Sequence, residues 1–359
     1  MNYLLRRIGQ TLGFGTADPP PISEVNESSD AYKEKLEKEL TQYADDIDVH
    51  ALPEIFHYWS NRYVRPWFEA VGATHPEDLF ARYLLLAAKT ATGKPRFLSI
   101  GSGNGDVEVT VARDLLSRGL EDFTIECLEI NPIMLARGRS LAREAGVEHL
   151  LRFEQADFNA WTPRSSYHGV LANQCLHHVT NLEGLFDSIA ESLTPKGYFI
   201  SSDMIGRNGH QRWPEALGHV RRLWQELPER YRYNHQTQRL ELDFINYDCS
   251  IEGFEGIRAQ DILPLLMQRF SFQVFIAFGN VIDPFIDRAF GHNFSVDEAD
   301  DRAFIDRVHA LDEAGFADGT LKPTHMVAVM VRQDLALDTP PVYARQLGPA
   351  QAVRSSAGR

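Results

Sequence analysis

The sequence predicts an α/β fold, in which helices cover both faces of a doubly wound, mostly parallel sheet of seven strands. Short apolar runs alternate with helix-period patterns between residues 96 and 205, as in parallel sheets with helical crossovers. A glycine-rich turn follows the first run, and two later runs, 271–278 and 325–331, complete the sheet. The other expected strands are 96–100, 123–129, 150–155, 168–173 and 196–203, and the expected helices between them are 106–118, 132–145 and 181–193.

The glycine-rich turn indicates which kind of cofactor the sheet would bind. Its spacing is Gly101-x-Gly103-x-Gly105, and Asp106 follows directly. A dinucleotide-binding turn has the spacing Gly-x-Gly-x-x-Gly, and the pyrophosphate lies at the helix N-terminus. In this sequence a negative side chain stands where a pyrophosphate would arrive. The pattern therefore argues against NAD and FAD.

The following strands end in polar residues that suit a nucleoside. Glu129 ends the second strand, 24 residues after Gly105, and a carboxylate at this position can accept hydrogen bonds from both ribose hydroxyls. The third strand leads into Asp157, and the fourth ends at Asn173, shortly before two adjacent histidines. The sequence therefore predicts a nucleoside site at the carboxyl ends of these strands.

In this order, the motifs resemble those of class I S-adenosylmethionine-dependent methyltransferases, over roughly residues 96–205. The resemblance implies a Rossmann-like core and S-adenosylmethionine as the cofactor. It also implies that Asp157 accepts a hydrogen bond from the adenine amino group, and that Phe158 and Ile130 flank the ring. Asn173 would face the methionine moiety. The predicted cofactor site comprises Gly101, Ser102, Gly103, Gly105, Glu129, Ile130, Asp157, Phe158 and Asn173.

The two histidines after the fourth strand, His177 and His178, are candidate catalytic residues. Methyl transfer is an in-line displacement that depends on positioning, and a hydroxyl nucleophile must also lose its proton to a general base. Histidine is the side chain best suited to that titration. We expect His177 to enter the cleft, although two structural histidines, with positioning alone driving the reaction, fit almost equally well.

Asp203, at the end of the fifth strand, is a further catalytic candidate, either as a base or as a ligand of a divalent ion. Asp243, Asp248 and His235 would be its partners in an oxygen-rich metal site. Their spacing matches no compact metal motif. The sequence therefore predicts no metal site.

Composition limits the function classes. The formal net charge of −14 disfavours binding to nucleic acids, which requires neutralisation of phosphates. The three cysteines are widely spaced and form neither a disulfide framework nor a metal cluster. No apolar run is long enough to span a membrane. These features are typical of a cytoplasmic protein with a small-molecule substrate.

The chain is longer than a minimal nucleotide-binding fold, so additions to the core are expected. We divide it into a flexible or amphipathic segment (1–29), a helical cap (30–92), the cofactor-binding core (93–205), a lid rich in arginine and aromatic residues (206–258), the rest of the core with an insertion at 280–323 (259–333) and a tail that is disordered or packed along the surface (334–359).

The lid is the main candidate for substrate recognition. Residues 206–240 contain seven arginines and three glutamates among several aromatic side chains. Such a segment either binds an anionic or polyhydroxylated substrate or forms a solvated amphipathic helix over 211–227, and both interpretations stay open. In the cap, the aromatic pattern of 50–72 is most simply a core stripe. The candidate substrate-binding residues from the cap and the lid are Tyr58, Arg62, Trp213 and His235.

These observations predict a methyltransferase that uses S-adenosylmethionine to methylate a small molecule. The histidines favour a hydroxyl acceptor on a sugar, a glycoconjugate or a secondary metabolite. The alternatives are N- or C-methylation of a small molecule, a binding or scaffold protein without catalysis, and a dehydrogenase, against which the turn 101–106 counts. A homodimer is compatible with the aromatic insertions.

Overall fold

The computed structural model describes residues 32–37, 52–251, 253–337 and 339–354. At its centre is an eight-stranded sheet with the strand order β10-β8-β9-β5-β4-β1-β2-β3. β9 is antiparallel to both of its neighbours, and the other pairings are parallel. All seven expected strands are present, so the predicted mostly parallel α/β sheet is confirmed. They are β1 (Arg96–Ile100), β2 (Thr124–Glu129), β3 (Leu151–Gln155), β4 (Tyr167–Asn173), β5 (Leu193–Met204), β8 (Phe270–Phe278) and β9 (His325–Arg332).

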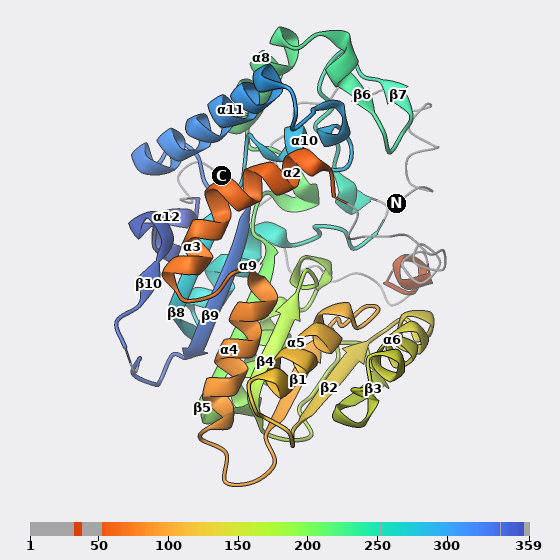
Figure 1. The fold of residues 1–359 in the computed structure, drawn as a ribbon, viewed down its shortest axis with the longest axis vertical. Coiled ribbons are helices and arrows are strands. Elements are labelled where there is room, and N and C mark those ends of the chain that lie inside the picture. The colour runs from red at the N-terminus through yellow and green to blue at the C-terminus, as the bar shows by residue number, and fades with distance from the viewer. Residues whose placement is uncertain (1–31, 38–51, 252, 338, 355–359) are drawn as a thin grey trace.

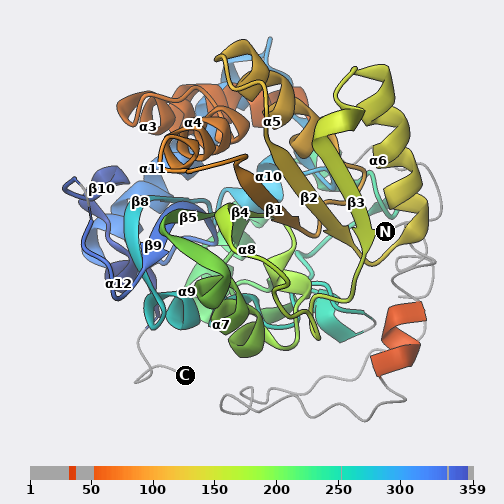
Figure 2. The ribbon, with the colours of Figure 1, turned by 90° about the horizontal axis from the view of Figure 1, so that it is seen from below.

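Helices cover the sheet on both faces (Figure 2). One face carries α4 (Pro76–Ala88), α5 (Asp106–Ser117) and α6 (Pro132–Glu144), and the other carries α7 (Leu182–Ser192) and α9 (Ala259–Met267). Successive residues of β1 enter different cores, because Phe97 packs into one apolar cluster and Leu98 into the other. Burial on both faces explains the continuous apolar runs of the central strands.

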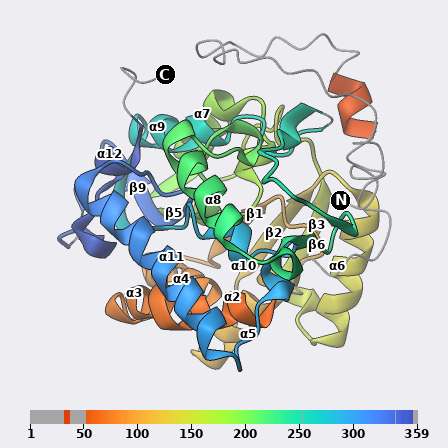
Figure 3. The same ribbon diagram turned by 90° about the horizontal axis from the view of Figure 1, so that it is seen from above.

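The lid and the insertion lie beyond the carboxyl ends of the strands (Figure 1). The lid contains α8 (Pro214–Glu226) and the short hairpin of β6 (Tyr233–Asn234) and β7 (Arg239–Leu240). The insertion contains α10 (Asp283–Ile286) and α11 (Ala299–Asp318), and Figure 3 shows α8 and α11 side by side. The two segments share an aromatic cluster in which the ring of Trp224 contacts those of Phe285 and Phe290. Two insertions that are distant in sequence therefore form one layer over the carboxyl ends of the strands.

The middle part of the helical cap packs on this layer. It consists of α2 (Glu54–Trp59), a π-helical turn (Ser60–Val64) and α3 (Arg65–Ala70). Ile55 and Trp59 are buried, and Trp59 Nε1 donates a hydrogen bond to His309 Nδ1 of α11 at 3.3 Å. The aromatic pattern of this segment is thus a core stripe. Among the described residues, no helix combines the length and the apolar character that a bilayer span requires.

Part of the expected tail, residues 342–352, is ordered in the structure and packs against the edge of the sheet. Val342 and Tyr343 form β10, which adds to the edge of the sheet beside β8, and Pro349–Ala352 form α12. Pairing with β10 gives partners to backbone groups of β8 that an edge strand would otherwise leave exposed. The segment 1–29 lies outside the described residues, and residues 32–37, near the start of the predicted helical cap (30–92), are helical.

Candidate active site

The glycine-rich turn between β1 and α5 adopts a backbone that only glycine adopts readily. Gly101, Gly103 and Gly105 all have positive φ values, of 64°, 54° and 77°. A Cβ atom at Gly101 would lie 2.4 Å from Cβ of Cys175, in the loop after β4. The turn therefore touches the loop that carries the two histidines, and both lie at neighbouring strand ends because β1 pairs with β4.

Glu129 lies against this turn. Its side chain is buried, and its Oε2 accepts a hydrogen bond from the backbone N–H of Gly103 at 2.9 Å. Its Oε1 accepts a second one from the N–H of Asn131 at 2.9 Å. Ser102 is linked to the same strand end through its N–H, which donates to the carbonyl of Leu128 at 3.0 Å. The carboxylate predicted to bind the ribose is thus held beside the glycine backbone.

The residues predicted to surround the adenine follow at the ends of β2 and β3. Asp157 Oδ2 accepts a hydrogen bond from the hydroxyl of Tyr32 at 2.8 Å, so the short helix of residues 32–37 reaches this position. Phe158 is almost fully buried, and the carbonyl of Ile130 accepts a hydrogen bond from Gln155 at 3.0 Å. Asn173, the last residue of β4, pairs with Ser202 of β5.

Asp203 is completely buried at the end of β5 and binds four donors from its surroundings. Its Oδ1 accepts from His177 Nδ1 at 2.6 Å and from the N–H of Met204 at 2.8 Å. Its Oδ2 accepts from the backbone N–H groups of Cys175 and Leu176 at 3.0 and 2.8 Å. Although burial alone raises the pKa of Asp203, His177 and these N–H groups lower it overall. Asp203 therefore orients the loop after β4 and the ring of His177.

Glu255 completes a cluster of ionisable side chains around His177. Its Oε1 lies 2.7 Å from His210 Nε2 and 3.5 Å from His177 Nε2, and its Oε2 lies 3.5 Å from His178 Nε2. Burial raises the pKa of Glu255, but His178, His177 and His210 bring it well below its ordinary value. Burial likewise lowers the pKa of His177, but Asp203 and Glu255, one at each ring nitrogen, raise it to about 10. We call His177, His178, His210, Glu255 and Asp203 the histidine–carboxylate cluster.

His210 and Glu255 are the members of this cluster that the sequence did not single out. They stand 45 residues apart within the lid and are brought together by two glycines. The N–H of Gly209 donates to the carbonyl of Gly256 at 2.9 Å, and a Cβ at Gly256 would lie 3.0 Å from the nitrogen of Gly209. The glycines beside each residue are the only signal in the sequence, and no spacing rule connects them.

The four candidate substrate-binding residues make hydrogen bonds and ring contacts with residues outside the histidine–carboxylate cluster. Tyr58 donates to Asp306 of α11 at 2.9 Å, and Arg62 Nε donates to the hydroxyl of Tyr63 at 3.0 Å. The ring of Trp213 lies 4.3 Å from the guanidinium of Arg354. His235, in the turn of the lid hairpin, has its Nε2 2.9 Å from Oδ1 of Asn293 in the insertion. The structure therefore does not bring these four residues to the histidine–carboxylate cluster.

The acidic residues considered as metal partners of Asp203 also have other contacts. Asp243 Oδ1 accepts from Gln225 at 2.9 Å, and Asp248 Oδ1 accepts from the N–H and hydroxyl of Ser250 at 2.9 and 2.6 Å. Neither contact involves Asp203. The oxygen-rich site considered from the sequence is not formed by these residues.

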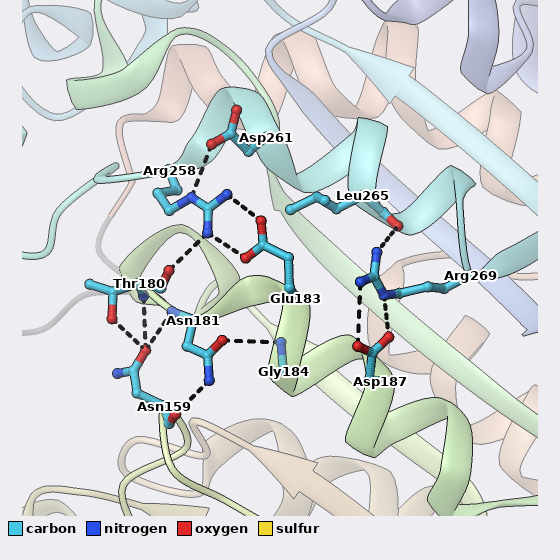
Figure 4. Close-up of polar contacts among 10 residues, drawn as sticks. All are labelled: Asn159, Thr180, Asn181, Glu183, Gly184, Asp187, Arg258, Asp261, Leu265 and Arg269. Atoms are coloured by element: carbon cyan, nitrogen blue, oxygen red, sulfur yellow. Dashed lines mark hydrogen bonds and ion pairs between the residues drawn. The ribbon is translucent and has the colours of Figure 1, made fainter. Parts of the chain in front are cut away.

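A polar network ties the loop after β4 to the lid (Figure 4). Arg258 is buried and donates to both carboxylate oxygens of Glu183, at 2.6 and 2.8 Å, and to the carbonyl of Thr180 at 2.9 Å. Thr180 in turn donates from its N–H and its hydroxyl to Asn159 Oδ1, at 2.8 and 2.9 Å. The network fixes the segment after Asp157, the loop of the histidines and the end of the lid relative to one another.

The structure is an α/β fold with a glycine turn at the carboxyl end of β1, a buried carboxylate against that turn, and a histidine–carboxylate cluster beside it. Residues 92–249 match the family model described as a methyltransferase domain. They form a class I S-adenosylmethionine-dependent methyltransferase domain, and S-adenosylmethionine is the cofactor of this enzyme.

Several solved structures are similar to this chain. Geranyl diphosphate C-methyltransferase from Streptomyces coelicolor A3(2) has 13% identity, covering 71% of this chain and 79% of that one, with a TM-score of 0.40. A putative sarcosine dimethylglycine methyltransferase from Galdieria sulphuraria has 14% identity, 84% and 97% coverage, and a TM-score of 0.44. The glycopeptide N-methyltransferase MtfA has 22% identity, 38% and 57% coverage, and a TM-score of 0.28. None of the curated proteins matches the chain.

Proposed function

We propose that this methyltransferase transfers the methyl group of S-adenosylmethionine to a hydroxyl group of a small molecule. The observation that carries the proposal is the contact between His177 and Asp203 directly beyond β4, at 2.6 Å. The loop that holds His177 touches the glycine turn through Cys175 and Gly101. A methyl group delivered from the cofactor at this turn would therefore arrive close to the histidine–carboxylate cluster.

The chemistry of the cluster supports an oxygen acceptor. A hydroxyl is a weak nucleophile and loses its proton as its oxygen bonds to the methyl carbon, so it needs a polar group that handles the proton. A histidine whose other nitrogen is held by a buried carboxylate is such a group, and His178 lies directly beside it with ring centres 4.3 Å apart. A neutral amine attacks without this help. Asp203 acts as the positioning residue, because its oxygens are engaged by His177 and by backbone N–H groups.

A polar small molecule, such as a sugar, a glycoconjugate or a hydroxylated secondary metabolite, suits this site. The formal net charge of −14 opposes nucleic acids as acceptors. The lid contributes His210 and Glu255 to the cluster, and both are partly buried, with side-chain exposures of 19% and 29%. Partly covered polar side chains are suited to an acceptor with several hydroxyl groups.

The test is a panel of small hydroxyl compounds with matched amines, incubated with S-adenosylmethionine and analysed by mass spectrometry. We expect a methyl ether together with S-adenosylhomocysteine. For Asp203→Asn, we expect kcat to fall by about 10- to 100-fold, because the partner that orients His177 is altered, whereas cofactor affinity stays unchanged. Asp243→Asn, in the exposed part of the lid, is the matched control. Products methylated only at nitrogen or carbon, or no turnover on any acceptor, would overturn the proposal.

A further inference from the structure

Three side chains of the kinds that bind transition metals meet at the histidine–carboxylate cluster. His177 comes from the loop after β4, His210 from the turn after β5, and Glu255 from the segment before α9. The ligand atoms, one from each residue, all lie within 4.8 Å of one another. Two imidazoles and one carboxylate are a donor set that suits zinc and iron.

The separations between these atoms are close to those around a metal ion. Ligand atoms at about 2.1 Å from a tetrahedral zinc ion lie about 3.4 Å from one another. His177 Nε2 and Glu255 Oε1 are 3.5 Å apart. His210 Nε2 and Glu255 Oε1 are 2.7 Å apart, so a small rotation of either side chain would bring this pair to the same spacing.

The surroundings of His177 orient the ring nitrogen that would bind the metal. His177 Nδ1 donates to Asp203 Oδ1 at 2.6 Å, which directs Nε2 toward Glu255, and an ion that binds Nε2 would displace the proton that this nitrogen carries in the charged ring. A carboxylate behind a histidine is the usual second partner of a metal-binding imidazole, because it fixes the ring and makes its other nitrogen a better donor. Asp203 is fully buried, so water does not compete for this contact.

The other two side chains are held by backbone geometry. His210 has a φ of 55°, directly after Gly209 with a φ of 63°. A non-glycine residue in this region is strained, and such strain is concentrated at functional sites. Glu255 stands between the aromatic residue Phe254 and Gly256, whose close contact with Gly209 joins the two lid segments. The chain thus uses two unusual turns to bring His210 and Glu255 to the same point.

We propose that His177, His210 and Glu255 bind one divalent transition-metal ion, of the zinc or iron(II) class, which coordinates the hydroxyl group of the methyl acceptor. This inference rests on the hydroxyl acceptor proposed above; with the ion bound, His177 Nε2 is a ligand, and the ion takes over the role in deprotonation that the proposed function gives to the ring. Three protein ligands leave a coordination position open for the acceptor oxygen. A bound metal ion makes a coordinated hydroxyl more acidic. The proton leaves to solvent, the oxygen bonds to the methyl carbon, and the bond from that carbon to the sulfonium breaks, giving a methyl ether and S-adenosylhomocysteine.

The experiment uses the full chain, purified, treated with chelator and titrated with Co²⁺ and Zn²⁺. Calorimetry should show about one equivalent of Zn²⁺ per chain, and Co²⁺ should give the visible absorption of a site with nitrogen and oxygen ligands. His210→Ala and Glu255→Gln should each weaken Zn²⁺ binding at least about 10-fold. His219→Ala, a histidine of α8 that contacts Arg222, should bind as the unaltered chain does. Thermal unfolding of each variant confirms that it is folded.

The outcomes separate this inference from the proposed function. Absence of Zn²⁺ and Co²⁺ binding, or equal binding by the unaltered chain and the folded Glu255→Gln and His210→Ala variants, would overturn the metal site even if a hydroxyl compound is methylated. Binding that both substitutions weaken would support the site. In that case, failure to methylate any hydroxyl compound with the ion bound would overturn the proposed acceptor and the role of the ion, but not the site itself.

Discussion

The proposed cofactor half and the proposed acceptor half of the active site are assembled in different ways. The cofactor half consists of consecutive strand ends, and its contacts are largely between a side chain and a nearby backbone, as between Glu129 and Gly103. The acceptor half joins His177, Asp203, His210 and Glu255, which come from four separate segments and contact one another through side chains. Local sequence therefore determines the first half, whereas the packing of the lid determines the second.

The largest effect is expected from Glu129→Ala in the cofactor half. The substitution removes the carboxylate predicted to bind the ribose hydroxyls, and charge-assisted hydrogen bonds of this kind contribute about 1.5 to 3 kcal/mol each. We expect the affinity for S-adenosylmethionine and S-adenosylhomocysteine to fall at least about 100-fold, measured by calorimetric titration beside NADH and NADPH.

The control for this prediction is Glu126→Gln, on the opposite face of the same strand, where the side chain contacts Arg96 and Tyr167. It should leave cofactor affinity unchanged. An equal loss in both variants would mean that the effect comes from damage to β2. Binding of the nicotinamide cofactors in preference to S-adenosylmethionine would remove the assignment of this half of the site.

A smaller effect is expected where the two halves are joined, from Arg258→Lys. A lysine keeps the charge but cannot make the paired hydrogen bonds to Glu183 and the bond to Thr180 at the same time. Because Arg258 is buried, we expect the free energy of unfolding to fall by about 2 kcal/mol, measured by urea denaturation. We also expect kcat to decrease more than cofactor affinity, since the network supports the loop of the histidines.

Arg269→Lys is the matched control, because Arg269 also pairs with a carboxylate of α7 (Figure 4). Its partner Asp187 is largely exposed, with 58% of its side chain accessible, and exposed pairs contribute about 0 to 1 kcal/mol. If the two substitutions lower the free energy of unfolding equally, the Arg258 network contributes no more than an exposed ion pair and does not join the two halves.

The same difference explains how much of the site could be predicted from the sequence. Apolar runs and glycine spacing predicted the strands, and the turn at Gly101 was recognisable because its backbone requires glycine. His177 and Asp203 were recognised one by one at strand ends. His210 and Glu255 were not, since they become neighbours only through the contact of Gly209 with Gly256. The arginines of the lid also have uses that composition does not reveal: Arg212, for example, pairs with Asp283 of α10 at 2.8 Å.

The smallest effect is expected from Glu108, a buried residue of α5 beneath the glycine turn. Its substitution tests whether the cofactor half contains a neutral carboxylic acid. Its Oε1 accepts a hydrogen bond from the hydroxyl of Ser99 at 2.5 Å. Burial, with a smaller contribution from Asp106 and Glu129, raises the pKa of Glu108 from 4.5 to about 7. Between these two values the folded chain keeps a proton that the unfolded chain has lost, so the contribution of Glu108 to stability decreases as the pH rises and levels off above about pH 7.

Glu108→Gln keeps the size and the acceptor oxygen but does not titrate. The difference in free energy of unfolding, variant minus unaltered chain, should therefore increase by about 1 kcal/mol between about pH 6 and pH 8, measured by urea denaturation at each pH. Glu121→Gln, at an exposed position before β2, should show no such trend. A constant difference for Glu108→Gln would mean that the glutamate is already charged at pH 6, and that the turn above it tolerates two neighbouring carboxylates without an effect on folding.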